Sequence, residues 1–227
     1  MVKRDLRLIA LPFNVAVNMV GGLNLYFYTY ALGDSSLFST SMLWAGIFGI
    51  GSLILFPRLI KTFGRKKVFQ MSILMPIVSA GVLYFASGYP ASAVLLVPVA
   101  GIAYGLSNAV YWLMILLMVA DTVDYGDMKL GIRSESISYS SHTLVIKCTG
   151  ALTGFLVGIT LTLIDYVPNQ EQTVETLVGL KSVYLASTLL CIAAYFIYRK
   201  FYRLNDGELD KIQHELQEKY AAEPAMT

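Results

Sequence analysis

The sequence predicts an all-α integral membrane protein with six transmembrane helices, and three observations support this. Of its 227 residues, 56% are hydrophobic and only 14% are charged, whereas a soluble domain carries about 25% charged residues. Six stretches are long and apolar enough to cross a bilayer, whose hydrocarbon core of about 30 Å takes about 20 residues of helix. Basic residues gather in alternate connections between these stretches.

Polar segments separate the six apolar stretches and set their limits. Residues 33–36 close the first stretch, a basic segment at 61–67 follows the second, and 88–90 close the third. We expect a charged loop at 121–135 and a polar loop at 165–179. The predicted spans are residues 8–32, 37–60, 68–87, 92–120, 136–164 and 181–198. Together they make a six-helix bundle over residues 1–203, and residues 204–227 form a tail, either solvated or partly an amphipathic helix.

The distribution of basic residues predicts the orientation in the membrane. If the N-terminus is inside, the outer connections hold Lys181 as their basic residue, and Lys147 lies within a span. The inner side then holds Lys3, Arg4, Arg7, Arg58, Lys61, Arg65, Lys66, Lys67, Lys129, Arg133, Arg199, Lys200, Arg203, Lys211 and Lys219. Because basic residues concentrate on the cytoplasmic side of membrane proteins, both termini are predicted to be cytoplasmic.

The sequence gives no sign of an enzyme or a metal site. Cys148 and Cys191 lie in apolar runs, and His142 and His214 lack cysteine or carboxylate neighbours at ligand spacing. Nucleophile motifs, Gly-rich phosphate loops and zinc signatures are absent from the sequence. A net charge of +2 gives no reason to expect a nucleic-acid partner. We therefore expect no catalytic activity, no metal and no nucleic acid.

Lys147 is the intramembrane charge that needs an explanation. It lies about ten residues into the fifth predicted span, about 15 Å along the helix, where a lysine is costly and usually serves a function. Thr143 lies one turn earlier on the same face. The alternative is that the lysine stem reaches back to the inner interface. The sequence has no acidic residue at comparable depth, so a charged partner would belong to a ligand or to another polypeptide.

Small and polar residues mark three of the predicted helices. Gly150, Gly154 and Gly158 recur every four residues in the fifth span, a spacing that lets another helix approach closely. Asn14 and Asn18 lie one turn apart in the first span, and these amides either line a polar pathway or join helices. Tyr26, Tyr28 and Tyr30 follow near the outer end, and we interpret them as an interfacial belt.

The fourth span combines aromatic and polar side chains. It contains Tyr104, Asn108, Tyr111 and Trp112, and Gly101, Gly105 and Asn108 share a face. An aromatic ring beside polar groups suits stacking on the apolar face of a sugar, although the pattern alone favours ordinary helix packing for Trp112. At the inner end of this span, Asp121 and Asp124 could form ion pairs that hold one conformation.

The segment after the fourth span also carries a family motif, Ala120-Asp121-Thr122-Val123-Asp124-Tyr125-Gly126, then Lys129, Arg133 and Glu135. This motif resembles that of the glycoside–pentoside–hexuronide:cation symporters, a family of the major facilitator superfamily. The resemblance covers nearly the whole chain. Further stretches resemble the melibiose-carrier branch: Phe13-Asn14 with Asn18, Leu55-Phe56-Pro57-Arg58-Leu59, Tyr166-Val167-Pro168-Asn169, Phe201-Tyr202-Arg203-Leu204-Asn205 and Lys219-Tyr220.

The resemblance implies a fold of two six-helix bundles with the sugar held between them, of which this chain matches the second, C-terminal one. It implies that Lys147, Thr143 and Trp112 face the sugar. It also implies that Asp121, Asp124, Arg133 and Glu135 belong to an inner gate. The family's coupling-cation site, for Na+, H+ or Li+, and its main sugar-binding carboxylates lie in the first bundle, which this chain does not match.

Two positions depart from the family pattern. His142 stands where an amide beside the sugar is expected, a change that bears on substrate preference. Lys61 stands where the superfamily loop usually has an aspartate, although Gly64-Arg65-Lys66 of that loop is retained.

The leading hypothesis is therefore half of a melibiose-type symporter in a bacterial inner membrane, working by alternating access. Its partners would be membrane lipid, a small galactoside-like sugar and an N-terminal six-helix half. The expected substrate-binding residues are Lys147, Thr143, Trp112, His142, Asn14 and Asn18. Two alternatives stay open: a truncated or associating membrane protein without transport activity, and a half-carrier that pairs with a second copy of itself.

Overall fold

The computed structural model describes the backbone of residues 2–130, 135–201 and 215, and the side chains of 11–89, 91–128, 135–200 and 215. Within these residues the chain is helical and contains no strand. Its elements are α1 (Val2–Tyr26), the short π-helix η1 (Phe27–Ala31), α2 (Ser36–Phe63), α3 (Arg65–Ala86), α4 (Pro90–Leu130), α5 (Glu135–Leu163) and α6 (Val174–Phe201).

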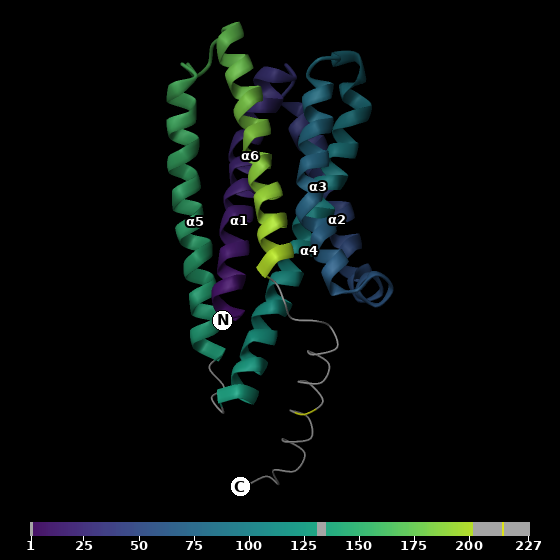
Figure 1. Cartoon of the computed structure of the whole chain (residues 1–227). Helices are drawn as coiled ribbons and strands as arrows, with labels where there is room; N and C mark the ends of the chain where they lie inside the picture. The colour runs from purple at the N-terminus through teal and green to yellow at the C-terminus, as the bar shows by residue number, and fades with distance from the viewer. Residues whose placement is uncertain (1, 131–134, 202–214, 216–227) are drawn as a thin grey trace.

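The long helices pack as two groups of three. In one group α4 contacts both α2 and α3, and in the other α1 contacts both α5 and α6. The contact between α3 and α6 joins the two groups. Figure 1 shows α5 and α2 at opposite sides of the bundle, and α1 and α5 both begin at its lower end. Helix α5 is held mainly by α1, so much of its circumference is not covered by any described residue.

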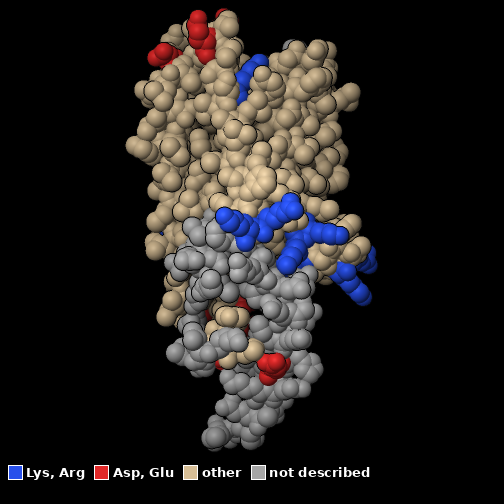
Figure 2. Space-filling model, viewed as in Figure 1, with Lys and Arg blue, Asp and Glu red and all other residues tan. Residues whose placement is uncertain are grey.

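The surface of the bundle is that of a multi-pass membrane protein. Five helices, α2 to α6, are long and apolar enough to cross a bilayer; the described side chains of α1 begin at residue 11, which leaves too short a stretch to judge in the same way. Large apolar side chains such as Ile54, Leu95 and Leu163 are about three-quarters exposed. Lys and Arg form a band near the end where α2 meets α3, and the surface that extends away from it is largely free of charged residues (Figure 2).

Small residues bring α2 and α4 into backbone contact. Ser41, Ala45 and Gly49 of α2 are buried against Gly101 and Gly105 of α4. A Cβ atom placed on Gly105 would lie 2.6 Å from Ala45 Cα, closer than any ordinary carbon contact. Glycine is therefore required in α4 for the observed approach of the two helices.

The three glycines of the fifth span meet no other helix among the described residues, so their role in close helix packing stays a prediction. A Cβ atom placed on Gly150, Gly154 or Gly158 would meet nothing within 4 Å. These glycines lie on the uncovered surface of α5, whereas the glycines that pack lie in α4.

Hydrogen bonds between buried polar side chains join the first helix to its neighbours. Tyr28 in η1 donates to Ser41 Oγ of α2 at 2.7 Å, and Tyr184 of α6 donates to Asn24 Oδ1 of α1 at 2.6 Å. Tyr28 is 1% exposed, so its predicted place in an interfacial belt is wrong. The ring lies in the core beside that of Phe27, which is buried in the same π-helical segment.

The prediction of a loop at 121–135 is wrong for its first ten residues, because α4 continues as a helix to Leu130. Arg65 Nη1, at the start of α3, lies 3.2 Å from Asp121 Oδ2 in an ion pair. Val123 and Asp127 are buried too. These tertiary contacts hold the charged segment in helical form. Apart from Glu215, the tail at 204–227 lies outside the described residues.

The connection before α2 is fixed by a short-range cap. The backbone N–H of Ser36 donates to Asp34 Oδ1 at 2.8 Å. Hydrogen bonds from Ser36, first through its side chain and then through its backbone, hold the pKa of the exposed Asp34 carboxyl below its usual range. The negative charge thus lies at the N-terminus of α2, where the helix dipole favours it.

Candidate functional site

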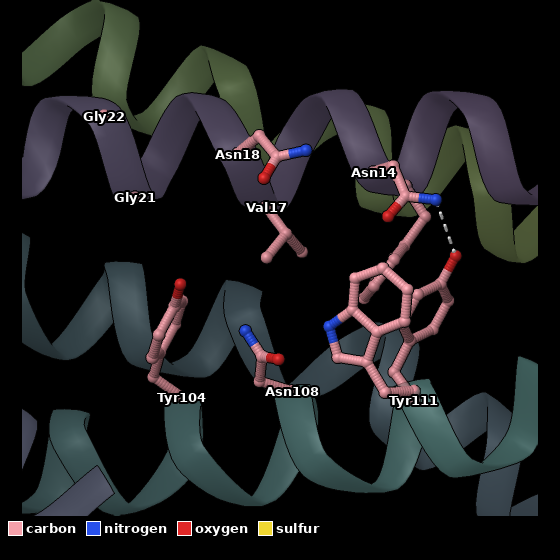
Figure 3. Close-up of a pocket in the computed structure, with 10 residues that line it drawn as sticks. Asn14, Val17, Asn18, Gly21, Gly22, Tyr104, Asn108 and Tyr111 are labelled. Carbon is pink, nitrogen blue, oxygen red and sulfur yellow. Dashed lines mark hydrogen bonds between the residues drawn. The ribbon is translucent and has the colours of Figure 1, made fainter. Parts of the chain in front are cut away.

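A cavity of about 280 Å³ lies between α1 and α4. Its volume is near the lower end of small-molecule pockets, which run from about 300 Å³ upward. Tyr104 and Asn108 of α4 and Val17 of α1 point into the space between the two helices (Figure 3). The complete lining is Phe13, Asn14, Val17, Asn18, Gly21, Gly22, Tyr104, Asn108, Tyr111 and Trp112.

The helical repeat explains why these side chains share one cavity. Asn14, Asn18 and Gly21 follow each other at one-turn intervals on α1, as do Tyr104, Asn108 and Tyr111 on α4. The glycines leave room beside the rings: a Cβ atom on Gly21 would lie 3.6 Å from the Tyr104 hydroxyl. The result is a neutral surface of amides, hydroxyls and aromatic faces, which suits hydrogen bonding and stacking with a polar ring.

Asn14 and Asn18 differ in availability. Asn14 is 3% exposed, and its Nδ2 donates to the Tyr111 hydroxyl at 3.2 Å. Phe13 packs on Tyr111 with ring centroids 3.9 Å apart. Asn18 is exposed and lines the same cavity. Asn14 therefore holds Tyr111 in place at the edge of the cavity, while the side chain of Asn18 is accessible to a ligand.

His142 reaches the cavity wall from α5 without lining the cavity itself. Its ring packs edge-on against Trp112, with centroids 6.5 Å apart. It is 8% exposed, and its buried Nε2 has no hydrogen-bond partner among the described residues. A polar atom buried without a partner is costly, so a ligand group that reaches it would gain a hydrogen bond at little cost.

Thr143 and Lys147 lie on the uncovered surface of α5. Both are exposed, and both share a face with Gly150 and Gly154 at helical spacing. On the adjacent side of α5, Val157 packs against α1: a Cβ atom on Gly22 would lie 3.1 Å from Val157 Cγ2. Gly22 lines the cavity, so the polar face of α5 begins beside the cavity wall.

The four residues expected at an inner gate are not all described. Asp121 is 3% exposed and is paired with Arg65 of the same bundle. Asp124 is half-buried near the end of α4, and Glu135 begins α5 as an exposed residue. Arg133 lies outside the described residues.

Among the described side chains, no group of three or more His, Cys, Asp or Glu could hold a metal ion.

Sequence reasoning singled out Asn14, Asn18 and Trp112, which the fold brings to one cavity. It did not select Tyr104, Asn108 and Tyr111 as binding residues, because aromatic and amide side chains in a helix are equally typical of packing. Their spacing on one face of α4, opposite the asparagines of α1, is the signal that could have found them. No feature of the sequence indicated that Arg65 would pair with Asp121.

Comparison with known proteins agrees with this architecture. The family model for MFS/sugar transport proteins matches residues 4–206. A protein assigned as a sulfoquinovose importer of Escherichia coli K12 is 34% identical over 92% of this chain and 44% of its own length. A glucuronide carrier protein homolog of the same organism is 28% identical over 91% of this chain and 45% of its own length.

A lactose permease of Lactobacillus delbrueckii subsp. bulgaricus is 25% identical over 94% of this chain and 35% of its own length. The chain thus spans less than half the length of these curated relatives. These relatives are transporters and not enzymes. From the family match and the sugar-transporter relatives together, the chain belongs to the glycoside–pentoside–hexuronide:cation type of MFS sugar transporters.

Proposed function

We propose that the chain is one half of a sugar:cation symporter, which takes up a small sugar between itself and a second six-helix bundle. One observation carries the proposal: the neutral, aromatic-lined cavity between α1 and α4 lies beside a polar face of α5 that no described residue covers. A complete binding site would be closed on all sides. The open face beside the cavity supports a site that a second bundle would complete.

Alternating access would follow from rocking of the two bundles around this shared site. Asn18, Asn108 and Trp112 would contact the sugar from one wall, and Thr143, Lys147 and His142 would complete it from α5. Because the described cavity lining holds no carboxylate, a coupling cation (Na+, H+ or Li+) would bind in the other bundle. That bundle would be the N-terminal half, and this chain the C-terminal one.

The resemblance to the melibiose-carrier branch favours a galactoside-like sugar, and similarity to a lactose permease supports that choice. The band of Lys and Arg at one end of the bundle supports cytoplasmic termini in a bacterial inner membrane. Asp121, Asp124 and Glu135 lie at that same end and would act in an inner gate. The ion pair of Asp121 with Arg65 would hold α3 and α4 together while the bundles rock.

The test is reconstitution in liposomes of the chain with and without a first bundle from a curated relative. We expect sugar uptake that requires both halves, rises with an inward sodium or proton gradient, and is lost in Trp112→Ala. Uptake by the chain alone would favour self-pairing. Tight association of the halves without uptake of any sugar would favour a protein that assembles but does not transport. Crosslinking in the membrane separates the paired and unpaired forms.

A further inference from the structure

The exposed side of α2 changes from apolar to basic toward the end where α2 meets α3. Ile50 and Ile54 are exposed, and Arg58 and Lys61 follow them on the same side of the helix, since residues three and four positions apart lie one above the other. Arg58 is nine residues beyond the buried Gly49, which places it half a turn around the helix. Because Gly49 packs against α4, this stripe faces away from the bundle.

Helix α3 carries a matching stripe that begins with a cation. Lys67 is exposed near the start of α3, and the exposed side continues at helical spacing through Met71, Leu74 and Val78. Leu74 is two residues from the buried Ser72, about 160° around the helix, so this stripe also faces outward. Neither helix contains an acidic residue. Each stripe therefore joins an apolar surface to a basic end.

The turn at Gly64 brings the two basic ends together. Gly64 has a φ of 79°, a value that glycine adopts without strain, and α3 begins directly after it. Both helices extend from this turn toward the opposite end of the bundle (Figure 1), so residues equally far from Gly64 lie at similar depth. Lys61 and Lys67 are each about 4.5 Å from it along their helix axes, and Ile54 and Leu74 are each about 15 Å from it.

The stripes have the length of one leaflet of a bilayer. Lys61 and Ile50 are eleven residues apart, about 16.5 Å along the helix, and one leaflet contributes about 15 Å to a hydrocarbon core of about 30 Å. An acyl chain that lies along either stripe thus has its headgroup at the level of Lys61 and Lys67. Basic side chains at such a level keep their stems on the apolar surface and extend their charge to the headgroups. A phospholipid phosphate accepts charge-assisted hydrogen bonds, which are stronger than neutral ones.

The charge around this turn favours a headgroup with a net negative charge. The carboxylate of Asp121 reaches the turn, but it is buried and paired with Arg65. The basic surface also continues onto α6, because the ring of Tyr198 packs on Phe69 with centroids 4.6 Å apart and Arg199 follows as an exposed cation. Figure 2 shows Lys and Arg as one band across this end. The band would attract an anionic headgroup and repel the ammonium group of a zwitterionic one.

We infer that the turn between α2 and α3 binds one anionic phospholipid, with its phosphate on Lys61 and Lys67 and its acyl chains along the two exposed stripes. Arg58, about one turn from Lys61, would contact the same headgroup. Neither helix lines the cavity between α1 and α4, and both stripes point away from α4. A second bundle that closes the cavity would therefore leave the turn to lipid, and the inference stands apart from the proposed function.

The test is native mass spectrometry of the detergent-purified chain, titrated with phosphatidylglycerol or phosphatidylcholine of identical acyl chains. Both lipids carry the phosphate, so the ratio of their dissociation constants measures selectivity for net negative charge. Soluble glycerol phosphate, which has the phosphate but no acyl chain, separates a lipid site from a phosphate site. The ratio is measured in the wild type, in Lys67→Gln, and in the double variants Lys61→Gln/Lys67→Gln and Lys61→Arg/Lys67→Arg. Lys181→Gln, at the other end of the bundle, is the matched control for the single variant.

We expect one bound phosphatidylglycerol, favoured over phosphatidylcholine by about tenfold or more, because each cation near an anionic headgroup adds about fivefold in affinity. The preference should fall by about fivefold in Lys67→Gln and vanish in Lys61→Gln/Lys67→Gln. It should persist in Lys61→Arg/Lys67→Arg, which keeps both charges, and in Lys181→Gln.

Equal binding of the two lipids, or a preference that survives Lys61→Gln/Lys67→Gln, would overturn the inference. Displacement of phosphatidylglycerol by glycerol phosphate at equal concentration would overturn it in favour of a soluble anion. A preference that appears only after removal of residues 204–227, a predominantly acidic tail, would make that tail the occupant of the turn instead. The same titration of the two-bundle carrier should give the same ratio, and loss of the preference there would mean that the second bundle covers the turn.

Discussion

Replacement of Gly105 by alanine tests the most closely packed contact in the bundle. The new Cβ would lie 2.6 Å from Ala45 Cα and 2.7 Å from Ala45 C, and it would be nearer still to the carbonyl oxygen. Carbon atoms in contact are about 3.5–4.0 Å apart, so α2 and α4 would have to separate locally by almost 1 Å. The neighbouring contact of Gly101 with Ser41 lies one turn away and would loosen with it.

The expected change in the free energy of unfolding for Gly105→Ala is the difference between two opposed effects. Overpacking costs about 1–3 kcal/mol, and the upper end applies because the obstacle is backbone and not a flexible side chain. Alanine gains about 1 kcal/mol over glycine in helix propensity. The net loss for Gly105→Ala is therefore about 2 kcal/mol, or roughly 4–8 °C in unfolding temperature for a chain of this size.

Gly154→Ala is the matched control, because it lies in another apolar helix where an added Cβ meets nothing within 4 Å. Only the propensity gain remains there, so its unfolding temperature should rise by about 2 °C. The assay is thermal unfolding in detergent in a Cys148→Ser background, followed by a thiol-reactive fluorophore that labels the buried Cys191 on unfolding. If Gly105→Ala is as stable as the parent, or if Gly154→Ala loses as much, the assigned helix contact is wrong.

Three further predictions use the same assay. Tyr184→Phe removes the hydroxyl that donates to Asn24 and should cost about 1 kcal/mol, with no further loss in an Asn24→Ala background; a full additional loss there would refute the hydrogen bond. Arg65→Gln removes the guanidinium that pairs with the buried Asp121 and should cost about 3 kcal/mol, part of which Asp121→Asn should restore; additive losses would argue against the ion pair. Because the pKa of Asp34 is lowered in the folded chain, its contribution is complete above the unfolded pKa of about 4 and is lost as pH falls through the folded value. The difference in unfolding temperature between wild type and Asp34→Ala should therefore be present at pH 7 and shrink below about pH 4; a difference independent of pH would exclude the carboxylate as its source.

The six helices were predictable because lipid leaves the backbone few choices. A segment that crosses the hydrocarbon core must satisfy its own hydrogen bonds, so length and apolar composition suffice to locate each helix. The ends depend on other information. Helix α4 runs on through Asp121 to Leu130 because Arg65, fifty-six residues away in sequence, pairs with the charge that looked like the start of a loop.

The glycines show where sequence patterns cannot decide. Gly101 and Gly105 repeat at the same spacing as Gly150 and Gly154, and both pairs are typical of close helix packing. Only the first pair has a neighbour in the described chain. The glycine spacing predicts a helix surface without bulky side chains. Whether another helix packs on that surface depends on the tertiary arrangement.

The candidate site was predictable in part for a related reason. Polar groups in a membrane span are few, so Asn14, Asn18 and Lys147 were conspicuous. Aromatic residues are common in such helices, so nothing marked Tyr104 or Tyr111 until the fold placed them opposite the asparagines. The roles of these side chains in sugar binding remain predictions for the transport assays above.

The uncovered face of α5 has a consequence for the life of the chain in the cell. Held mainly by α1, this helix presents Lys147 on a surface of glycines and threonine. Whenever that surface meets lipid, the lysine alone costs about 2.5–3.5 kcal/mol, a sizeable fraction of the stability of an ordinary domain. A copy without a covering partner would thus carry this cost for as long as the face of α5 meets lipid.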